Sequence, residues 1–387
     1  MIPLAVPNLS GNEGAYLNEC IDTTFVSSVG EFVNRLEKDA AVATGAKGVV
    51  ATSAGTTALH AALLVLGVRP GDLVIVPSFT FIASANAVRH ANADPWFFDI
   101  DPSSWCIDLK QVRKELEEHC VIRRGMTYHR ATGRRVTAMM PVYTLGNMPI
   151  MDEARAICDE WHLALLADAA CAIGSTYKGR QLAELADLSA ISLNGNKTVT
   201  AGGGGLIVGI DDGLLDEVRH LTTTARVWPN YDFDRVGYNY RLTNLQAAVA
   251  VAQLERLDEF VSRKREVRAA YNNAFANLEG IGTFPEPNWC ESACWFSGVV
   301  LDDKTHTNTF VKELNEAGIG AKAFWKPVHL QEPYANSLTA DDLSVTEALW
   351  SRVVTLPCST GISDPEIATV IRTTRALLKG GDSQNED

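Results

Sequence analysis

Short apolar runs alternate with helical patterns along the first half of the chain. Five runs have the length and composition of buried strands, at residues 49–51, 72–77, 95–100, 137–143 and 163–166. Four stretches beside them carry the pattern of helices, at residues 58–66, 83–90, 109–119 and 151–161. Strands that alternate with helices are typical of a mostly parallel sheet covered on both faces, so the pattern predicts an α/β domain.

The pattern changes after residue 244, where apolar positions recur at helical spacing as far as about residue 275. Beyond this long helix the chain predicts strands at 296–301 and 319–324 and helices at 306–317 and 365–378. We therefore expect three parts: a large domain at 1–244, a small α+β domain at 245–379 and a disordered acidic tail at 380–387.

The large domain is expected to begin with an N-terminal segment of two short helices around a loop at residues 25–30. Ser10, followed three residues later by Glu13, predicts a capping box at the start of the first of these helices.

Composition narrows the class of protein. With 387 residues, 46% of them hydrophobic, the chain is long enough for two domains with large cores. No apolar run approaches the length of a membrane span, and no signal peptide is evident, so we expect a cytoplasmic protein that does not bind membranes. A net charge of −13 argues against a general nucleic-acid binder. The eight cysteines are scattered without zinc-site spacing, so no metal site is expected.

The first candidate for chemistry is a polar, glycine-rich loop between two apolar runs at residues 189–208. Four consecutive glycines, Gly202 to Gly205, let the backbone pass close to another group. The loop holds one lysine, Lys197, whose amine is placed as an imine-forming lysine requires. From this stretch alone, a surface lysine in a flexible hairpin is an equally good interpretation.

Two further features fall at the carboxyl ends of predicted strands, where ligands of such sheets bind. Residues 52–57 carry four hydroxyl residues and a glycine at a helix start, which favours a phosphate site over simple helix capping. Asp168 ends an apolar strand, where it either caps the following segment or pairs with a protonated ring nitrogen.

Together these parts suit pyridoxal 5′-phosphate. The loop at Gly55 and Thr56 would bind the phosphate, and an aromatic ring from Phe79 or Phe81 would lie against the cofactor ring. Asp168 would keep the ring nitrogen protonated, and Lys197 would hold the aldehyde and later act as acid and base. A dinucleotide oxidoreductase is excluded, because no G-x-G-x-x-G follows the first strand.

The chain resembles the DegT/DnrJ/EryC1/StrS sugar aminotransferases over nearly all of residues 2 to 375. The motifs that carry the resemblance are Ala54-Gly-Thr-Thr-Ala-Leu59, Pro77-Ser-Phe-Thr-Phe-Ile-Ala-Ser-Ala-Asn86, Asp168-Ala-Ala170, Ser192-Leu-Asn-Gly-Asn-Lys197 and Gly237-Tyr-Asn-Tyr-Arg241. The resemblance implies the type I fold of the pyridoxal phosphate-dependent transferases, with a large, mostly parallel-sheet domain and a small α+β C-terminal domain.

The resemblance also implies roles for individual residues. It makes Lys197 and Asp168 catalytic, Phe81 rather than Phe79 the stacking aromatic, and Ser192 a third phosphate ligand. Residues like Asn239 and Arg241 reach into the neighbouring subunit's site in this family, which implies an obligate homodimer with shared active sites. The substrate-facing residues implied are His329, Cys171 and Val26.

Within the family, the chain is similar to the enzymes that aminate C4 of UDP-2-acetamido-2,6-dideoxy-4-hexulose with L-glutamate as donor. GDP-perosamine synthases, which act on GDP-4-keto-6-deoxymannose, share much of the pattern and stay open as an alternative. Cys171 stands where the family carries a glutamate or glutamine, which leaves the exact sugar undetermined. A non-catalytic sensor of the cofactor or of a nucleotide-sugar is the second alternative. A dehydratase would carry histidine in place of Lys197.

Overall fold

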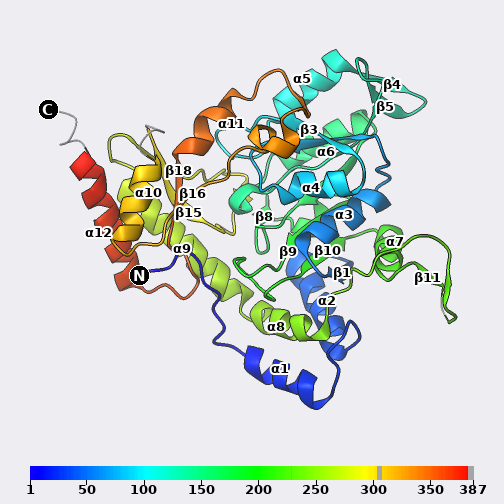
Figure 1. Ribbon diagram of the computed structural model, residues 1–387, viewed down its shortest axis with the longest axis horizontal. Helices are drawn as coiled ribbons and strands as arrows, with labels where there is room; N and C mark the ends of the chain where they lie inside the picture. Colours follow the sequence, from blue (N-terminus) through cyan, green and yellow to red (C-terminus); the bar gives the residue numbers. More distant parts are fainter. Residues whose placement is uncertain (228, 303–306, 382–387) are drawn as a thin grey trace.

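A ten-stranded sheet is the centre of the computed structural model, which describes residues 1–227, 229–302 and 307–381 (Figure 1). The main path of the sheet runs β1 (Gly48–Thr52), β10 (Gly205–Gly209), β9 (Leu188–Ser192), β7 (Ala164–Asp168), β6 (Arg135–Met139), β2 (Leu73–Pro77), β3 (Asp94–Phe98), β17 (Leu338–Thr339). Only β10 on this path is antiparallel to its neighbours. The mostly parallel sheet expected from the sequence is confirmed. A hairpin of β4 (Cys120–Arg123) and β5 (Met126–His129) extends it beside β6.

Alternate residues of the strands enter two separate hydrophobic cores, one on each face of the sheet. In β2, Val74 and Val76 face one core, while Leu73 and Ile75 face the other. The first core is covered by α3 (Gly55–Val65), α4 (Ala83–His90) and α7 (Asp212–Thr222). The second is covered by α2 (Glu31–Thr44), α5 (Leu109–His119), α6 (Met151–Glu160) and α8 (Asn244–Leu254). Helix α1 (Glu13–Asp22) packs on α8.

A third core lies around a four-stranded antiparallel sheet built from the C-terminal part of the chain. Its order is β13 (Ile281–Thr283), β15 (Ser297–Leu301), β18 (Val353–Leu356), β16 (Lys322–Ala323). The helices in this part are α9 (Leu257–Phe275), α10 (Thr307–Glu316), α11 (Ser344–Leu349) and α12 (Asp364–Gly381). This mixed arrangement of helices and antiparallel strands is the α+β architecture expected there.

The remaining elements are short. Two small ladders pair β8 (Thr176–Tyr177) with β14 (Cys290–Glu291) and β11 (Arg226–Val227) with β12 (Asp232–Phe233). Single 3₁₀ turns occur at η1 (Thr144–Gly146), η2 (Leu182–Glu184), η4 (Val328–Leu330), η5 (Glu332–Tyr334) and η6 (Trp350–Arg352).

Two helix predictions were wrong in detail. The long helix expected from residue 245 to 275 breaks at Arg256, whose backbone is not helical, into α8 and α9. Helix α8 packs in the second core, whereas α9 begins in that core with Leu257 and Val261 and enters the C-terminal core from Val267 onward, so tertiary packing rather than a proline or glycine decides the break. The capping box at Ser10 is also wrong: α1 begins after Asn12, and the carboxylate of Glu13 accepts the Gly11 N–H instead (2.9 Å).

The predicted domain division stays a prediction. Helix α8 lies after the proposed boundary at 244/245, yet it packs on α1 and α2 of the N-terminal part. Of the predicted tail, residues 380 and 381 belong to α12, and residues 382–387 lie outside the described part of the chain. No helix among the described residues is long and apolar enough to cross a membrane.

Two segments cross between the N-terminal and C-terminal parts of the chain. Ile2 exchanges backbone hydrogen bonds with the segment before β16, donating to Gly318 O and accepting from Gly320 N (both 2.8 Å). In the other direction, β17 joins the large sheet in parallel with β3.

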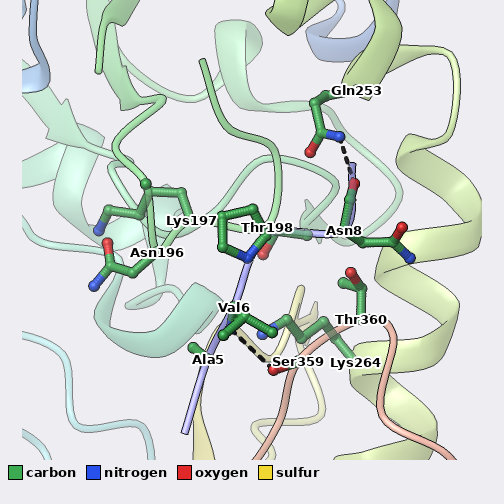
Figure 2. Close-up of a pocket in the computed structure, with 12 residues that line it drawn as sticks. Ala5, Val6, Asn8, Asn196, Lys197, Thr198, Gln253, Lys264, Ser359 and Thr360 are labelled. Carbon is green, nitrogen blue, oxygen red and sulfur yellow. Dashed lines mark hydrogen bonds between the residues drawn. The ribbon is translucent and has the colours of Figure 1, made fainter. Parts of the chain in front are cut away.

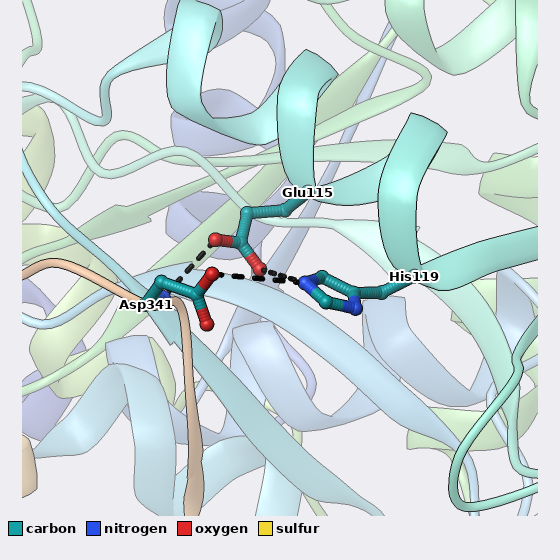
Figure 3. A group of neighbouring side chains, drawn as sticks. All are labelled: Glu115, His119 and Asp341. Atoms are coloured by element: carbon teal, nitrogen blue, oxygen red, sulfur yellow. Dashed lines mark hydrogen bonds and ion pairs between the residues drawn. The ribbon is translucent and has the colours of Figure 1, made fainter.

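A cluster of titratable side chains lies just beyond β17 (Figure 3). Glu115 and His119 lie one turn apart on α5, and the buried Glu115 carboxylate accepts the backbone N–H of Asp341 (3.0 Å). The Nε2 atom of His119 lies 3.6 Å from Glu115 and 3.8 Å from Asp341. Two of the three side chains face solvent, and nothing else among the described residues marks a metal centre there, so the expectation of no metal stays a prediction.

A buried histidine on α3 makes stability depend on pH. The His60 side chain is buried between His90, Tyr238 and Tyr240, and its Nδ1 lies 3.2 Å from the Tyr240 hydroxyl. Burial, with a smaller effect of the His90 charge, lowers the pKa of His60 from 6.5 to about 4.

The unfolded chain therefore binds a proton at His60 more readily than the folded chain does, and stability falls as the pH drops from 6.5 toward 4. The full loss is on the order of 3 kcal/mol. Denaturant titrations at a series of pH values should show a steeper loss in the wild type than in His60→Asn. Exposed His162, replaced in the same way, is the control. Equal pH dependence in the two variants would contradict this account.

Candidate active site

A cavity of about 600 Å³ opens where the carboxyl ends of the parallel strands face the C-terminal sheet. Seven of the residues predicted from the sequence line it: Gly55, Thr56, Phe81, Asp168, Cys171, Ser192 and Lys197. They lie on four different segments of the sequence, so only the folded sheet brings them together.

One end of the cavity is built to receive an anion. Gly55 and Thr56 form the first turn of α3, where backbone N–H groups have no partner within the helix. A Cβ atom added to Gly55 would lie 3.2 Å from the hydroxyl of Ser192, so this hydroxyl faces the same turn. The alternative interpretation, helix capping by Ser53 or Thr56, does not hold, because the N-cap residue is Ala54 and has no side-chain bond.

The glycine run lets β10 pass very close to this turn. Gly204 has φ +115°, a backbone conformation that L side chains rarely adopt. A Cβ atom at Gly205 would lie 2.6 Å from Ala54 O and 2.8 Å from Gly55 N. The glycines therefore shape the floor of the anion site, rather than making a hairpin flexible.

Asp168 lies at the end of β7 with its carboxylate buried. Its Oδ2 accepts the hydroxyl of Ser84 (2.6 Å), and its Oδ1 accepts the backbone N–H of Ala170 (3.1 Å). Burial raises the pKa of this carboxyl group, and the two hydrogen bonds and the charge of Lys197 oppose the rise. No helix follows Asp168, so it is not a helix cap. Ser84 was not predicted as a site residue, although the motif from Pro77 to Asn86 contains it.

Lys197 is half-buried in the loop between β9 and β10, as the sequence predicts. Its Nζ donates to the Sγ of Cys171 (3.2 Å) and lies 3.9 Å from the centre of the Trp295 ring. Burial raises the pKa of the Cys171 thiol, partly offset by the nearby Lys197 amine. A far smaller cavity, of about 10 Å³, lies behind this loop and has room for about one water (Figure 2).

The two candidate aromatic residues, Phe79 and Phe81, differ in burial and in position. Phe81 lines the cavity with 56% of its surface exposed, whereas Phe79 is fully buried in the C-terminal core. The ring of Phe81 lies 6.0 Å from that of Trp325, which also lines the cavity. Trp325 and Trp295 were not predicted as site residues. In the sequence each tryptophan stands beside a phenylalanine, in Trp295-Phe296 and Phe324-Trp325, and this pairing does not by itself mark a site.

Four predicted residues are not brought into the cavity of this chain. Val26 and Asn239 are exposed away from it. Arg241 pairs with Glu37 (3.1 Å) on α2, and burial lowers its pKa. His329 accepts or donates a hydrogen bond at 2.6 Å with Ser78 and lies 3.1 Å from Glu347.

The fold and this constellation define a pyridoxal phosphate-dependent aminotransferase of the type I class. The chain matches the DegT/DnrJ/EryC1/StrS aminotransferase family over residues 7–375, and it belongs to that family.

Relatives agree with this assignment. The chain is 37% identical to a GDP-perosamine synthase of Caulobacter vibrioides over 96% of both chains. It is 34% identical to a putative pyridoxal phosphate-dependent aminotransferase, EpsN, of Bacillus subtilis, over 96% of this chain and 94% of the relative. A solved DegT DnrJ EryC1 StrS aminotransferase from Brucella abortus superposes with a TM-score of 0.87, at 26% identity over 95% of both chains.

The residues present fit the cofactor. The donor set supplies amides at a helix start for a phosphate, a buried carboxylate for a protonated ring nitrogen and an amine for an aldehyde. The close packing of Gly205 on the first turn of α3 leaves space for a phosphate only if no side chain intrudes there.

A Gly205→Ala substitution should therefore weaken cofactor binding. The new methyl group collides with Ala54 and Gly55 backbone atoms and displaces the first turn of α3, at an overpacking cost of about 1–3 kcal/mol. We expect the dissociation constant for pyridoxal phosphate, measured by absorbance titration, to rise about tenfold or more.

Gly195→Ala in the Lys197 loop is the matched control, because its nearest neighbour, Gly202 O, lies 3.8 Å from the added carbon. Equal cofactor affinity in the two variants would show that the approach of β10 does not shape the site.

Proposed function

We propose that this protein transfers the amino group of L-glutamate to C4 of a GDP-linked 4-keto-6-deoxy sugar. The observation that carries an aminotransferase reaction is the single cavity that holds Lys197, Asp168 and the α3 amides. The 37% identical relative is named GDP-perosamine synthase, and this favours the GDP-linked sugar over the UDP-linked sugar, which the sequence motifs had favoured. Nothing in the cavity favours a non-catalytic sensor.

The proposed residues divide into three groups by the part of the cofactor that each would hold. Gly55, Thr56 and Ser192 bind the phosphate, and Phe81 lies against the ring. Asp168 accepts a hydrogen bond from the protonated ring nitrogen, and this bond replaces part of the solvation that burial removes from the carboxylate. Ser84 holds that carboxylate in place through Oδ2 (2.6 Å).

When bound, pyridoxal phosphate supplies an aldehyde that exchanges amino groups and a ring that withdraws electrons from the reacting carbon. Lys197 holds the cofactor and, once an amino donor displaces its amine, moves a proton to and from the substrate carbon. The neighbouring Cys171 thiol, 3.2 Å from Nζ, takes the place of a charged or amide side chain in the family pattern. We therefore propose that Cys171 faces the sugar and bears on which sugar is accepted.

The amino acceptor is tested directly with a panel of substrates. Purified protein is loaded with pyridoxal phosphate and incubated with glutamate and separate GDP- and UDP-linked 4-keto-6-deoxy sugars. We expect the GDP-linked 4-keto-6-deoxymannose to gain an amino group, seen by mass, with at least about tenfold higher kcat/KM than the UDP sugar. The Lys197→Ala variant is the control for uncatalysed amination. Preferential amination of the UDP-linked sugar would overturn the choice of substrate and leave the reaction class intact.

We also propose that the protein works as a homodimer with active sites shared between subunits. Asn239 and Arg241 lie on the segment beside the phosphate-binding turn, bridged to Thr223 and Thr52, but neither lines the cavity of its own chain. Large apolar side chains are exposed close by in sequence, at Val227, Tyr231, Phe233 and Val236.

Mixing two inactive variants tests this sharing. A Lys197→Ala subunit and an Asn239→Ala subunit, unfolded together and refolded as mixed dimers, should regain activity, because one of the two sites then has both residues. The maximum expected is about a quarter of wild-type activity, since random pairing makes half of the dimers mixed. Homodimers of each variant, treated identically, are the controls. Activity no higher than in these controls would count against shared sites.

A further inference from the structure

Trp295 belongs to the C-terminal core and contacts the loop between β9 and β10 that carries Lys197, called here the lysine loop. Its indole N–H donates to the backbone carbonyl of Asn196 (2.8 Å), the residue before Lys197. The face of its ring lies 3.9 Å from Nζ of Lys197, well within the range of a cation–π contact. One side chain therefore contacts both the backbone of the loop and the amine that the loop carries.

Trp295 is itself held from three sides. Its backbone N–H donates to Leu145 O, and its carbonyl accepts the ammonium of Lys264 (both 2.9 Å). Its ring stacks on Phe296 at 4.0 Å between centres. Lys264 is only 3% exposed, so its ammonium group has lost most of its contact with water. The hydrogen bond to the Trp295 carbonyl offsets part of this desolvation cost.

The backbone on both sides of this contact is strained. Cys294, just before Trp295, has φ +52°, and Leu145, the acceptor of its N–H, has φ +61°. Residues other than glycine adopt such angles only where the surroundings hold them, and they are common where a site needs a side chain in one orientation.

Figure 2 shows the other side of the loop, where Lys264 extends from α9 into the small cavity that Asn196, Lys197 and Thr198 also line. The small cavity between them has room for about one water, so the loop has little space to retreat from the main cavity.

We propose that Trp295 is a positioning residue for Lys197: the indole N–H fixes the lysine loop, and the ring holds the amine at the mouth of the cofactor cavity. This inference rests on the proposed role of Lys197 and goes beyond it, because Trp295 takes no part in bond making. The indole N–H and the ring face of this one side chain thus have separate tasks, one on the loop backbone and one on the amine.

Two substitutions separate these tasks. Trp295→Phe keeps an aromatic face over the amine but removes the hydrogen bond to Asn196, and Trp295→Leu removes both. Trp289→Phe is the matched control, because Trp289 also donates its indole N–H to a backbone carbonyl, that of Met148 (2.8 Å), away from the cavity.

The first measurement uses protein without cofactor. Hydrogen exchange of the backbone amides of residues 194–198 should be faster in both Trp295 variants than in Trp289→Phe. Each variant is measured at the same interval below its own midpoint of thermal unfolding, so that a difference in global stability does not cause the effect. The second measurement follows attachment of pyridoxal phosphate to Lys197 by absorbance, with borohydride trapping and peptide mass to locate it. Attachment should slow about tenfold or more in Trp295→Phe and further in Trp295→Leu, because the second variant also removes the ring face that holds the amine at the cavity.

The outcomes distinguish the two proposals. If the wild type does not attach pyridoxal phosphate at Lys197, the proposed function fails, whereas exchange of the loop still tests the hydrogen bond. If the wild type attaches it and Trp295→Phe does so equally fast, with loop exchange like that of Trp289→Phe, Trp295 is only a core residue and the inference is overturned.

Discussion

The site depends on buried charged and polar groups whose desolvation the protein's own hydrogen bonds only partly offset. Asp168 loses water at the end of β7 and regains only a hydroxyl and one backbone N–H. A buried carboxylate in this state gains most from a cationic partner, because ion pairing repays desolvation only when both charges are held in position. The same cavity exposes the unpaired amides at the start of α3, which favour an anion. A ligand with a phosphate at one end and a protonated ring nitrogen at the other would satisfy both the amides and the carboxylate.

Close approach of backbone is the second constraint. The first turn of α3, the end of β9 and the start of β10 pack closely together, and this is possible only because Gly55 and Gly205 carry no side chain. The parallel sheet then places Asp168 next to this turn, since the carboxyl ends of its strands share one edge. The C-terminal core closes the cavity from the opposite side through Trp295 and Trp325. The chemistry thus depends on packing between cores as much as on the residues that touch a ligand.

Much of the fold and of the candidate site could be predicted from the amino-acid sequence. Strand and helix periodicity predicted the α/β part, because buried parallel strands are continuous apolar runs. The hydroxyl-rich helix start, the strand-end Asp168 and the lone Lys197 in a glycine-rich loop pointed to the cavity, since each is costly or unusual without a ligand. The preference for Phe81 over Phe79 came from the family resemblance, and their exposure, 56% against 0%, agrees with it.

Other features depend on contacts between residues far apart in sequence, so no local pattern contains them. The break at Arg256 has no proline or glycine, and it lets α9 run from the core in which α8 packs into the C-terminal core. The hydrogen bond from Trp295 to Asn196 joins segments about a hundred residues apart, and a buried tryptophan looks the same in sequence whether or not it holds a loop. The sequence by itself determined the elements and the reactive side chains, because hydrophobic period and residue chemistry are local. Tertiary structure alone decided which of these side chains share a cavity and what holds them there, because that depends on how three cores pack against one another.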